Sequence, residues 1–258
     1  MNSKNLHSRP LVPVNPNDLD DLDVALSGKR SEGDNTDFSF ENIQVADAER
    51  YLFLPAKSHG SYNYPNTLIS LERSYNGKNW FDTHKLLAAE GSYMPTIRQF
   101  VDFIKLLKSG KALNGKGQPL SASVIAGTLD DIFKLGDYRG RWLDADFKIV
   151  NGILHINYNH SLNAKGEIIP SKSEPLLAST LMSDRKPGID LEDWINRATA
   201  QGLPSSDVKQ GDIWYWHPGS DNNSVARFEA GSDGAGLDCN WDPSYADSSI
   251  GVNAAKKV

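Results

Sequence analysis

The C-terminal stretch Asn222–Val258, NNSVARFEAGSDGAGLDCNWDPSYADSSIGVNAAKKV, decides the fold. Residues of a mixed, mainly polar set alternate there with small or apolar residues, which are Val225, Phe228, Ala230, Ala235, Leu237 and Cys239. A period of two is typical of a β-strand that turns one face to a core and the other to solvent. The apolar residues are suited to packing in a core, whereas the residue types at the outward positions follow no structural rule. This division indicates a scaffold that displays side chains.

Four short motifs in this stretch carry a family resemblance. They are S-V-A-R-F (224–228), A-x-L-x-C (235–239), D-P-S (242–244) and S-x-x-G-V-x-A-A (248–255), the last followed by a basic C-terminus. Together they resemble the variable region of diversity-generating retroelement target proteins. The resemblance covers about residues 50–258, because it continues upstream through MPTIRQFVDFIKLLK (94–108), GRWLDADF (140–147), PGIDLEDW (187–194) and GDIWYWHP (211–218).

The resemblance implies both a fold and a function. Such a retroelement recopies the 3′ end of a target gene with errors at template adenines, so some codons become hypervariable while others stay fixed. The known variable proteins have a C-type-lectin fold, which formylglycine-generating enzymes share. We therefore expect an α+β protein with a small twisted antiparallel sheet, flanking helices, long loops and near-adjacent chain ends. The variable region would span about residues 214–258.

One position departs from the family pattern. Related C-termini often carry Arg where this chain has Asn253. Either the position is itself diversified, or a supporting ion pair is missing.

The alternation and the family pattern together predict which residues contact a variable target, expected to be a protein. These ligand-binding positions are Glu229, Asp233, Gly234, Gly236, Asp238, Asn240, Trp241, Tyr245, Asp247 and Ser248. Trp241 and Tyr245 are the expected anchors, because rigid aromatic side chains give a large contact area at low entropic cost. The alternative for the aspartates is plain solvated surface, and for the glycines it is turn or bulge geometry.

Composition restricts the classes of function. The chain has 258 residues, 39% of them hydrophobic and 23% charged, which is enough for one good-sized core or two small ones. The net charge of −6 argues against nucleic acid as a partner, because phosphate binding requires a concentrated basic surface. The single cysteine, Cys239, excludes an internal disulfide framework and a cysteine-rich zinc site.

Location and domain organisation follow from the distribution of apolar residues. No apolar run approaches the roughly 20 residues of a membrane helix, and the N-terminus lacks the apolar core of a secretory signal. We expect no membrane insertion and a cytoplasmic location by default, with export or association with a virus particle as alternatives. Residues 1–48 are rich in Asn, Asp, Ser and Pro, which predicts a flexible polar arm ahead of a lectin-like domain at 49–258. Such an arm could attach the domain to a carrier or a partner subunit.

Strands and helices are expected throughout the domain. Strands are predicted at 51–54, 67–70 and 212–216, and a hairpin joins 141–150 to 153–159 through Asn151-Gly152. Helices are predicted at 82–89 behind Asp82, from a Thr96/Gln99 capping box to Gly110, at 123–135 and at 191–200. In strand 212–216, Trp214 and Trp216 share one face and Tyr215 takes the other.

No metal or other cofactor is expected. His155 and His160 lie near the predicted hairpin, but no recognisable spacing supplies the three or four ligands of a zinc site. Calcium coordination is not expected at Asp242-Pro243-Ser244, because a second carboxylate beside the proline is missing. Sugar binding therefore does not follow from a lectin-like fold.

Two other classes of function compete with a non-enzymatic binding protein, which we favour; they are an enzyme and a structural subunit. An enzyme of the formylglycine-generating type needs a cysteine pair to hold copper, and Cys239 alone cannot form one. A carboxylate-pair hydrolase would need convergence of acids among Asp144, Asp146, Asp238 and Asp242. A non-diversified structural or adhesion subunit of a virus or cell surface could use the same fold.

Overall fold

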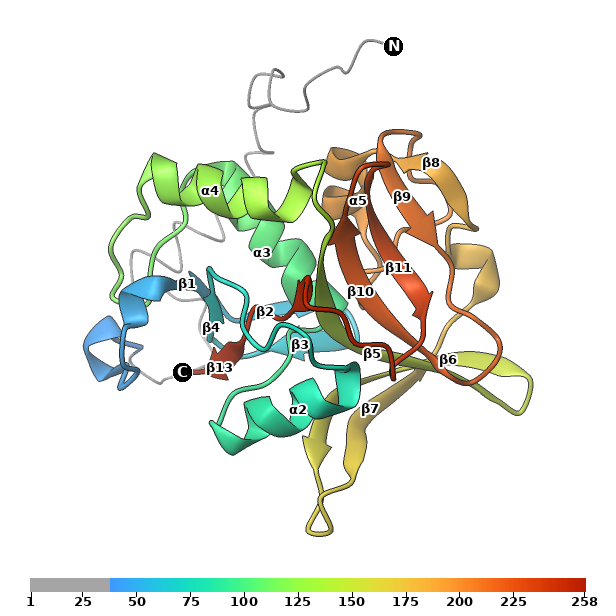
Figure 1. Cartoon of the computed structure of the whole chain (residues 1–258), viewed down its shortest axis with the longest axis horizontal. Helices are drawn as coiled ribbons and strands as arrows, with labels where there is room; N and C mark the ends of the chain where they lie inside the picture. The colour runs from blue at the N-terminus through green and yellow to red at the C-terminus, as the bar shows by residue number, and fades with distance from the viewer. Residues whose placement is uncertain (1–37) are drawn as a thin grey trace. The chain divides into compact units, whose positions relative to one another are not determined.

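The structure, a computed structural model, describes residues 38–258, of which Val45–Val258 form one compact unit (Figure 1). Most of the predicted N-terminal arm, residues 1–37, lies outside the described residues. Within residues 38–258, no helix has the length and apolar character needed to cross a membrane.

A mixed sheet of eight strands dominates the compact unit. Its order is β7-β6-β5-β10-β11-β9-β8, and β12 pairs with β5 off this path. The strands are β5 (Arg139–Val150), β6 (Ile153–Leu162), β7 (Ile168–Pro175), β8 (Arg185–Ile189), β9 (Ile213–Trp216), β10 (Ser224–Ala230), β11 (Ala235–Trp241) and β12 (Ile250–Gly251). Most neighbours are antiparallel, but β11 runs parallel to β9 and β12 parallel to β5. The sheet is therefore mixed, where a purely antiparallel one was expected.

The predicted hairpin is confirmed between β5 and β6. Asn151 and Gly152 connect the strands and both have positive φ, 51° and 80°, as a tight two-residue turn requires. The next strand, β7, extends this hairpin into a three-stranded ribbon (Figure 1). Sequence analysis missed β7 because nearly all of its residues are exposed, so no apolar alternation marks it.

A smaller sheet joins the two ends of the domain. It consists of β1 (Tyr51–Leu54), β4 (Thr67–Ser70) and β13 (Ala255–Lys257), in the order β1-β4-β13. Both strands predicted for this region, 51–54 and 67–70, are confirmed. Because β4 pairs with β1 on one side and β13 on the other, the C-terminal strand lies one strand away from the first. A separate short hairpin pairs β2 (Lys57–His59) with β3 (Tyr62–Tyr64).

The described residues form four α-helices, α2 (Trp80–Ala89), α3 (Ile97–Ser109), α4 (Ala122–Phe133) and α5 (Leu191–Arg197). The capping box of α3 is confirmed, since Thr96 and Gln99 each bond the other's backbone N–H. Helix α2 begins two residues earlier than predicted, because the side chain of Asn79, and not that of Asp82, caps it. Helices beside mainly antiparallel strands confirm the α+β class.

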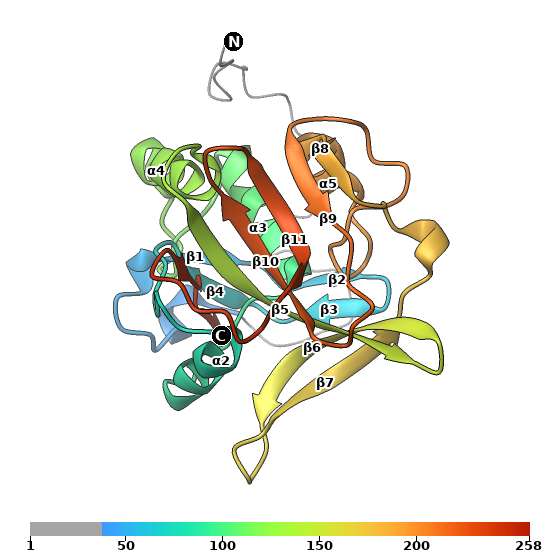
Figure 2. The ribbon, with the colours of Figure 1, turned by 45° about the vertical axis from the view of Figure 1, so that its right-hand side comes forward.

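The core between the large sheet and three helices centres on Phe228 of β10. Its ring lies 5.2 Å from Phe100 of α3, 5.6 Å from Phe133 of α4 and 6.3 Å from Trp194 of α5, measured between centroids. Figure 2 shows α3 behind β10 and β11. These aromatic contacts fix one face of the β10–β11 hairpin against the helices.

A buried polar cluster ties α3 to the β2–β3 hairpin. The Asp102 carboxylate lies 2.6 Å from His59 Nε2 and accepts hydrogen bonds from Tyr64 Oη at 2.7 Å and Arg98 Nη2 at 2.9 Å. Burial opposes the charged form of Asp102, but the hydrogen bond with His59 and the charge of Arg98 lower its pKa to about 2. The carboxylate therefore stays ionised, and it stabilises the fold.

Candidate ligand-binding site

The hairpin of β10 and β11 has one face in the core. Of the residues predicted to point inward, Phe228, Ala230, Ala235, Leu237 and Cys239 are buried in this core. Val225 is buried as well, but in a second hydrophobic cluster with Trp142, against which Trp241 packs. Burial raises the pKa of the Cys239 thiol well above its usual value. Because only the thiolate is reactive, Cys239 acts as a packing residue.

The opposite face of the same hairpin forms the wall of a pocket of about 560 Å³. Its lining residues are Tyr138, Trp216, Arg227, Glu229, Asp238, Trp241, Tyr245, Asp247 and Ser249. This volume lies within the range of roughly 300–1,000 Å³ that is usual for ligand sites.

Arg227 of β10 organises the pocket. Its guanidinium carbon lies 3.2 Å from the centroid of the Trp241 ring, which is a cation–π stacking distance. Its Nη2 atom lies 2.5 Å from Glu229 Oε2 and 3.8 Å from Asp238 Oδ2. The Arg227 side chain is only 3% exposed. The Trp241 ring and the carboxylates of Glu229 and Asp238 hold its guanidinium in place.

Aromatic rings form the remaining walls of the pocket. Trp241 meets Tyr245 edge to face, with ring centroids 5.3 Å apart. Tyr138 donates a hydrogen bond to Glu229 at 2.6 Å. Burial raises the pKa of Tyr138 well above its usual value, and the negative charge of Glu229 adds to the shift while Arg227 opposes it. The phenol therefore remains a hydrogen-bond donor.

Half of the ten predicted ligand-binding positions come together at this pocket. They are Glu229, Asp238, Trp241, Tyr245 and Asp247. Asp233 and Gly234 lie instead in the turn between β10 and β11, Asn240 is exposed on β11, and Ser248 is exposed in the segment before β12.

The outward row of β11 is less exposed than the alternation predicted. Gly236 is buried, and a Cβ atom added there would lie 2.8 Å from the Trp216 ring and 2.9 Å from the Trp214 carbonyl oxygen. Asp238 is 3% exposed, although it lines the pocket. The expectation of a uniformly solvent-exposed row is wrong at these two positions, because β9 and Arg227 cover this part of the hairpin.

Sequence reasoning missed Tyr138, Trp216, Arg227 and Ser249 as pocket residues. Alternation was the available signal for Arg227, because it stands two residues before Glu229 and therefore on the same face of β10; the register shift in the pairing of β10 lies before it, between Val225 and Arg227. Val225 and Phe228 are both buried although they stand three positions apart, because Phe228 lies in the main core and Val225 in a second hydrophobic cluster with Trp142. On β9, Tyr215 is fully buried and Trp216 reaches the pocket.

Asn253, the departure from the family pattern, lies in the interior. Its Oδ1 accepts a hydrogen bond from Arg141 Nε at 2.9 Å, and its Nδ2 donates to the Ser70 carbonyl at 3.0 Å. Arg141 also pairs with Asp131 at 2.5 Å. The amide thus bridges the large and small sheets, which is a structural role.

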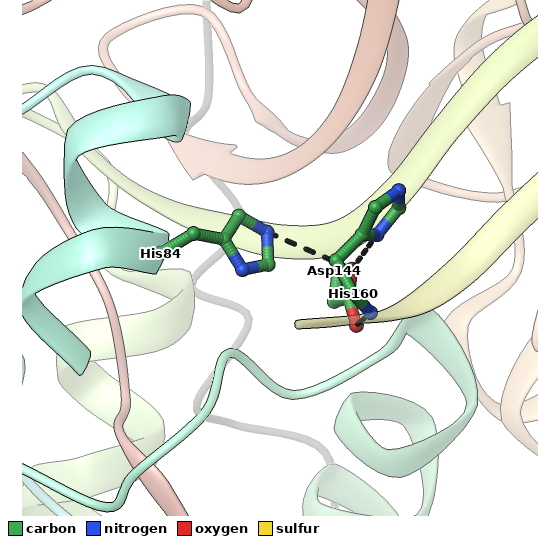
Figure 3. Close-up of side chains that lie close together, drawn as sticks. All are labelled: His84, Asp144 and His160. Carbon is green, nitrogen blue, oxygen red and sulfur yellow. Dashed lines mark hydrogen bonds and ion pairs between the residues drawn. The ribbon is translucent and has the colours of Figure 1, made fainter. Parts of the chain in front are cut away.

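A second polar cluster joins α2 to the β5–β6 hairpin (Figure 3). It contains His84, Asp144 and His160, and its ligand atoms lie within 4.8 Å of one another. Burial lowers the pKa of His84 to about 4, although Asp144 opposes the shift. Burial alone would also lower the pKa of His160. Its hydrogen bonds and ion pairs with Asp144 and Asp146 outweigh burial and raise the pKa to about 9.

The acids considered for a hydrolase are held by different partners. Asp144 and Asp146 lie beside His160, whereas Asp238 lies beside Arg227. Asp242 accepts hydrogen bonds from the backbone and hydroxyl of Ser244.

Comparison with known proteins gives no relative. No family model matches the chain, and neither does any curated protein or solved structure. The retroelement resemblance and the lectin-like fold therefore stay predictions based on the residues of this chain.

Proposed function

We propose that this protein is a non-enzymatic ligand-binding display protein with a C-type-lectin-like fold, whose C-terminal surface is diversified by a retroelement and recognises another protein. The observation that carries the proposal is the two-sided β10–β11 hairpin. One side packs on Phe100, Phe133 and Trp194, while the other lines the pocket. Exposed side chains around the pocket, such as Tyr245, can therefore change without altering the core.

The chemistry of the pocket suits recognition of a protein surface. Trp241 and Tyr245 offer rigid aromatic faces of the kind that dominate binding energy in protein interfaces. Among the lining residues, Arg227 is the one with a cationic side chain, beside the carboxylates of Glu229, Asp238 and Asp247. This balance favours a partner side chain that is basic or donates hydrogen bonds.

Two features of the scaffold support the lectin-like assignment. The class is α+β, with helices and long irregular segments around the sheets. The C-terminal strand β13 returns to the small sheet beside β4, which also pairs with β1. Near-adjacent ends of this kind are what the resemblance implies.

Diversification would not be equally tolerated along the hairpin. Tyr245 is 40% exposed, so exchange there disturbs no core contact. Gly236 is the opposite case, because a larger residue would displace Trp216 or the β9 backbone. We therefore expect variation to be concentrated around the pocket and to avoid position 236.

Selection from a random peptide library tests the binding function. The immobilised full-length protein should enrich peptides that bind it, and Tyr245→Ala should weaken their binding at least tenfold. Phe81→Ala is the matched control, because Phe81 on α2 is also 40% exposed but lies outside the pocket. Failure to enrich any peptide, or equal binding to the Tyr245→Ala protein, would contradict the proposal.

A further inference from the structure

The cluster of His84, Asp144 and His160 draws its three residues from three separate elements. His84 lies on α2, Asp144 on β5 and His160 on β6, and in Figure 3 the two imidazoles flank the carboxylate. Their side chains are 5%, 2% and 3% exposed. The cluster is thus closed to bulk solvent, unlike the pocket described above.

Two atoms around this cluster lack hydrogen bonds in the described part of the chain. His84 Nε2 is buried without a partner, and it lies 3.6 Å from Asp144 Oδ1, too far for a hydrogen bond. Asp146 Oδ1, 3.2 Å from His160 Nε2, also makes no bond of acceptable geometry. A bound cation would give His84 Nε2 the partner that it lacks.

We propose that His84, Asp144 and His160 bind one Zn²⁺ ion. Each residue offers one ligand atom, and these atoms lie within 4.8 Å of one another. The contacts of Asp144 Oδ1 with His84 Nε2 and with His160 Nδ1 point to these three atoms as the donors. Two imidazoles with one carboxylate are a zinc-type set, whereas Mg²⁺ and Ca²⁺ take oxygen donors. A solvent molecule completes the fourth position, as in other sites with three protein ligands.

Only a small rearrangement is needed to admit the ion. Donors around a tetrahedral Zn²⁺ with bonds of about 2.0–2.2 Å are separated by roughly 3.4 Å. The His84–Asp144 distance of 3.6 Å already fits, while His160 Nδ1 and Asp144 Oδ1, at 2.5 Å, must separate by about an ångström. The proton that these two atoms share leaves when the metal enters.

Neighbouring groups hold the ligands in orientation. Asp144 Oδ2 accepts a hydrogen bond from the His160 backbone N–H at 3.1 Å. Asp146 faces the second ring nitrogen of His160, which is the usual place of a carboxylate behind a zinc-bound histidine. The Trp80 ring lies 4.1 Å from His84 and 5.0 Å from His160, between centroids. The ion would therefore fasten α2 to the β5–β6 hairpin, independently of the proposed binding function.

Metal titration of the full-length protein tests the site. Protein stripped with EDTA and titrated with ZnCl₂ should bind one equivalent tightly, and substituted Co²⁺ should give the visible absorption of a tetrahedral centre. His84→Ala should abolish this stoichiometric binding. His155→Ala is the matched control, because His155 is on the same strand as His160 but contacts Ser173 instead. It should bind like the wild type.

A substitution at Asp146, which contacts the ligand His160 but does not bind the ion, distinguishes a metal site from a packing cluster. Asp146→Asn should retain one equivalent of Zn²⁺ but bind it about 10–100-fold more weakly. The proposal is overturned if the wild-type protein retains no Zn²⁺ after gel filtration and gives no tetrahedral Co²⁺ spectrum. It is also overturned if folded His84→Ala protein, checked by circular dichroism, binds Zn²⁺ as tightly as the wild type.

Discussion

Replacing Arg227 with Met should strongly destabilise the protein. The change removes the cation between Glu229 and Asp238 but leaves both carboxylates in place, with side chains only 14% and 4% exposed. Removing one partner from a buried ion pair costs about 3–5 kcal/mol, and the lost stacking on Trp241 adds up to about 2 kcal/mol. Because Glu229 keeps some contact with water, we expect a total near the lower end, about 3 kcal/mol.

Urea denaturation at neutral pH measures this loss in the free energy of unfolding. The matched control is Arg197→Met, because Arg197 also contacts two carboxylates, at 3.1 and 3.3 Å, but is 42% exposed. Its loss should stay below about 1 kcal/mol. Adding Glu229→Gln and Asp238→Asn to Arg227→Met should recover most of the stability, because no unpaired charge then remains. The reasoning is refuted if Arg227→Met costs no more than the control, or if the triple variant is no more stable than the single one.

Three further predictions concern the framework of the domain. Phe228→Ala should cost about 3–5 kcal/mol of unfolding free energy in urea, whereas Phe81→Ala, at an exposed position, should cost less than about 1 kcal/mol; equal losses would contradict the core assignment. Gly236→Ala should cost about 1–3 kcal/mol by overpacking against Trp216, and unchanged stability and tryptophan fluorescence would count against it. Asp102 has a folded pKa of about 2 against 3.8 as its ordinary value, so its ionisation contributes roughly 2 kcal/mol that is fully present above pH of about 4 and lost as the pH falls through 2. The stability difference between the wild type and Asp102→Asn should therefore shrink as the pH falls over that interval, and a difference independent of pH would exclude this linkage.

The elements that sequence predicted well are those with local chemical signals. The Thr96/Gln99 box fixes where α3 starts, and Asn151-Gly152 fixes the β5–β6 turn, because each acts through bonds or dihedral angles within a few residues. Strand β7 has no such signal, since its stability comes from pairing with β6 and not from an apolar face. The parallel pairing of β11 with β9 depends on chain segments that are distant in sequence.

Only part of the pocket could be predicted from the sequence, because some of its residues come from segments that no local pattern connects. Alternation places Arg227 and Glu229 on one face of β10, and the antiparallel register of the hairpin sets Arg227 opposite Asp238. Tyr138 comes from a segment far upstream, so no local pattern could have linked it to the site. The same holds for His84, which meets Asp144 only after α2 has docked on the β5–β6 hairpin.

Sequencing the 3′ end of the gene across many individuals of the source population tests the central claim most directly. The proposed function predicts amino-acid differences concentrated at pocket positions such as Trp241, Tyr245 and Asp247, with Arg227 and Phe228 constant. It also predicts an adjacent reverse transcriptase gene and a near-copy of this region that differs mainly at adenines. Differences spread evenly along the chain, or no differences at all, would contradict diversification.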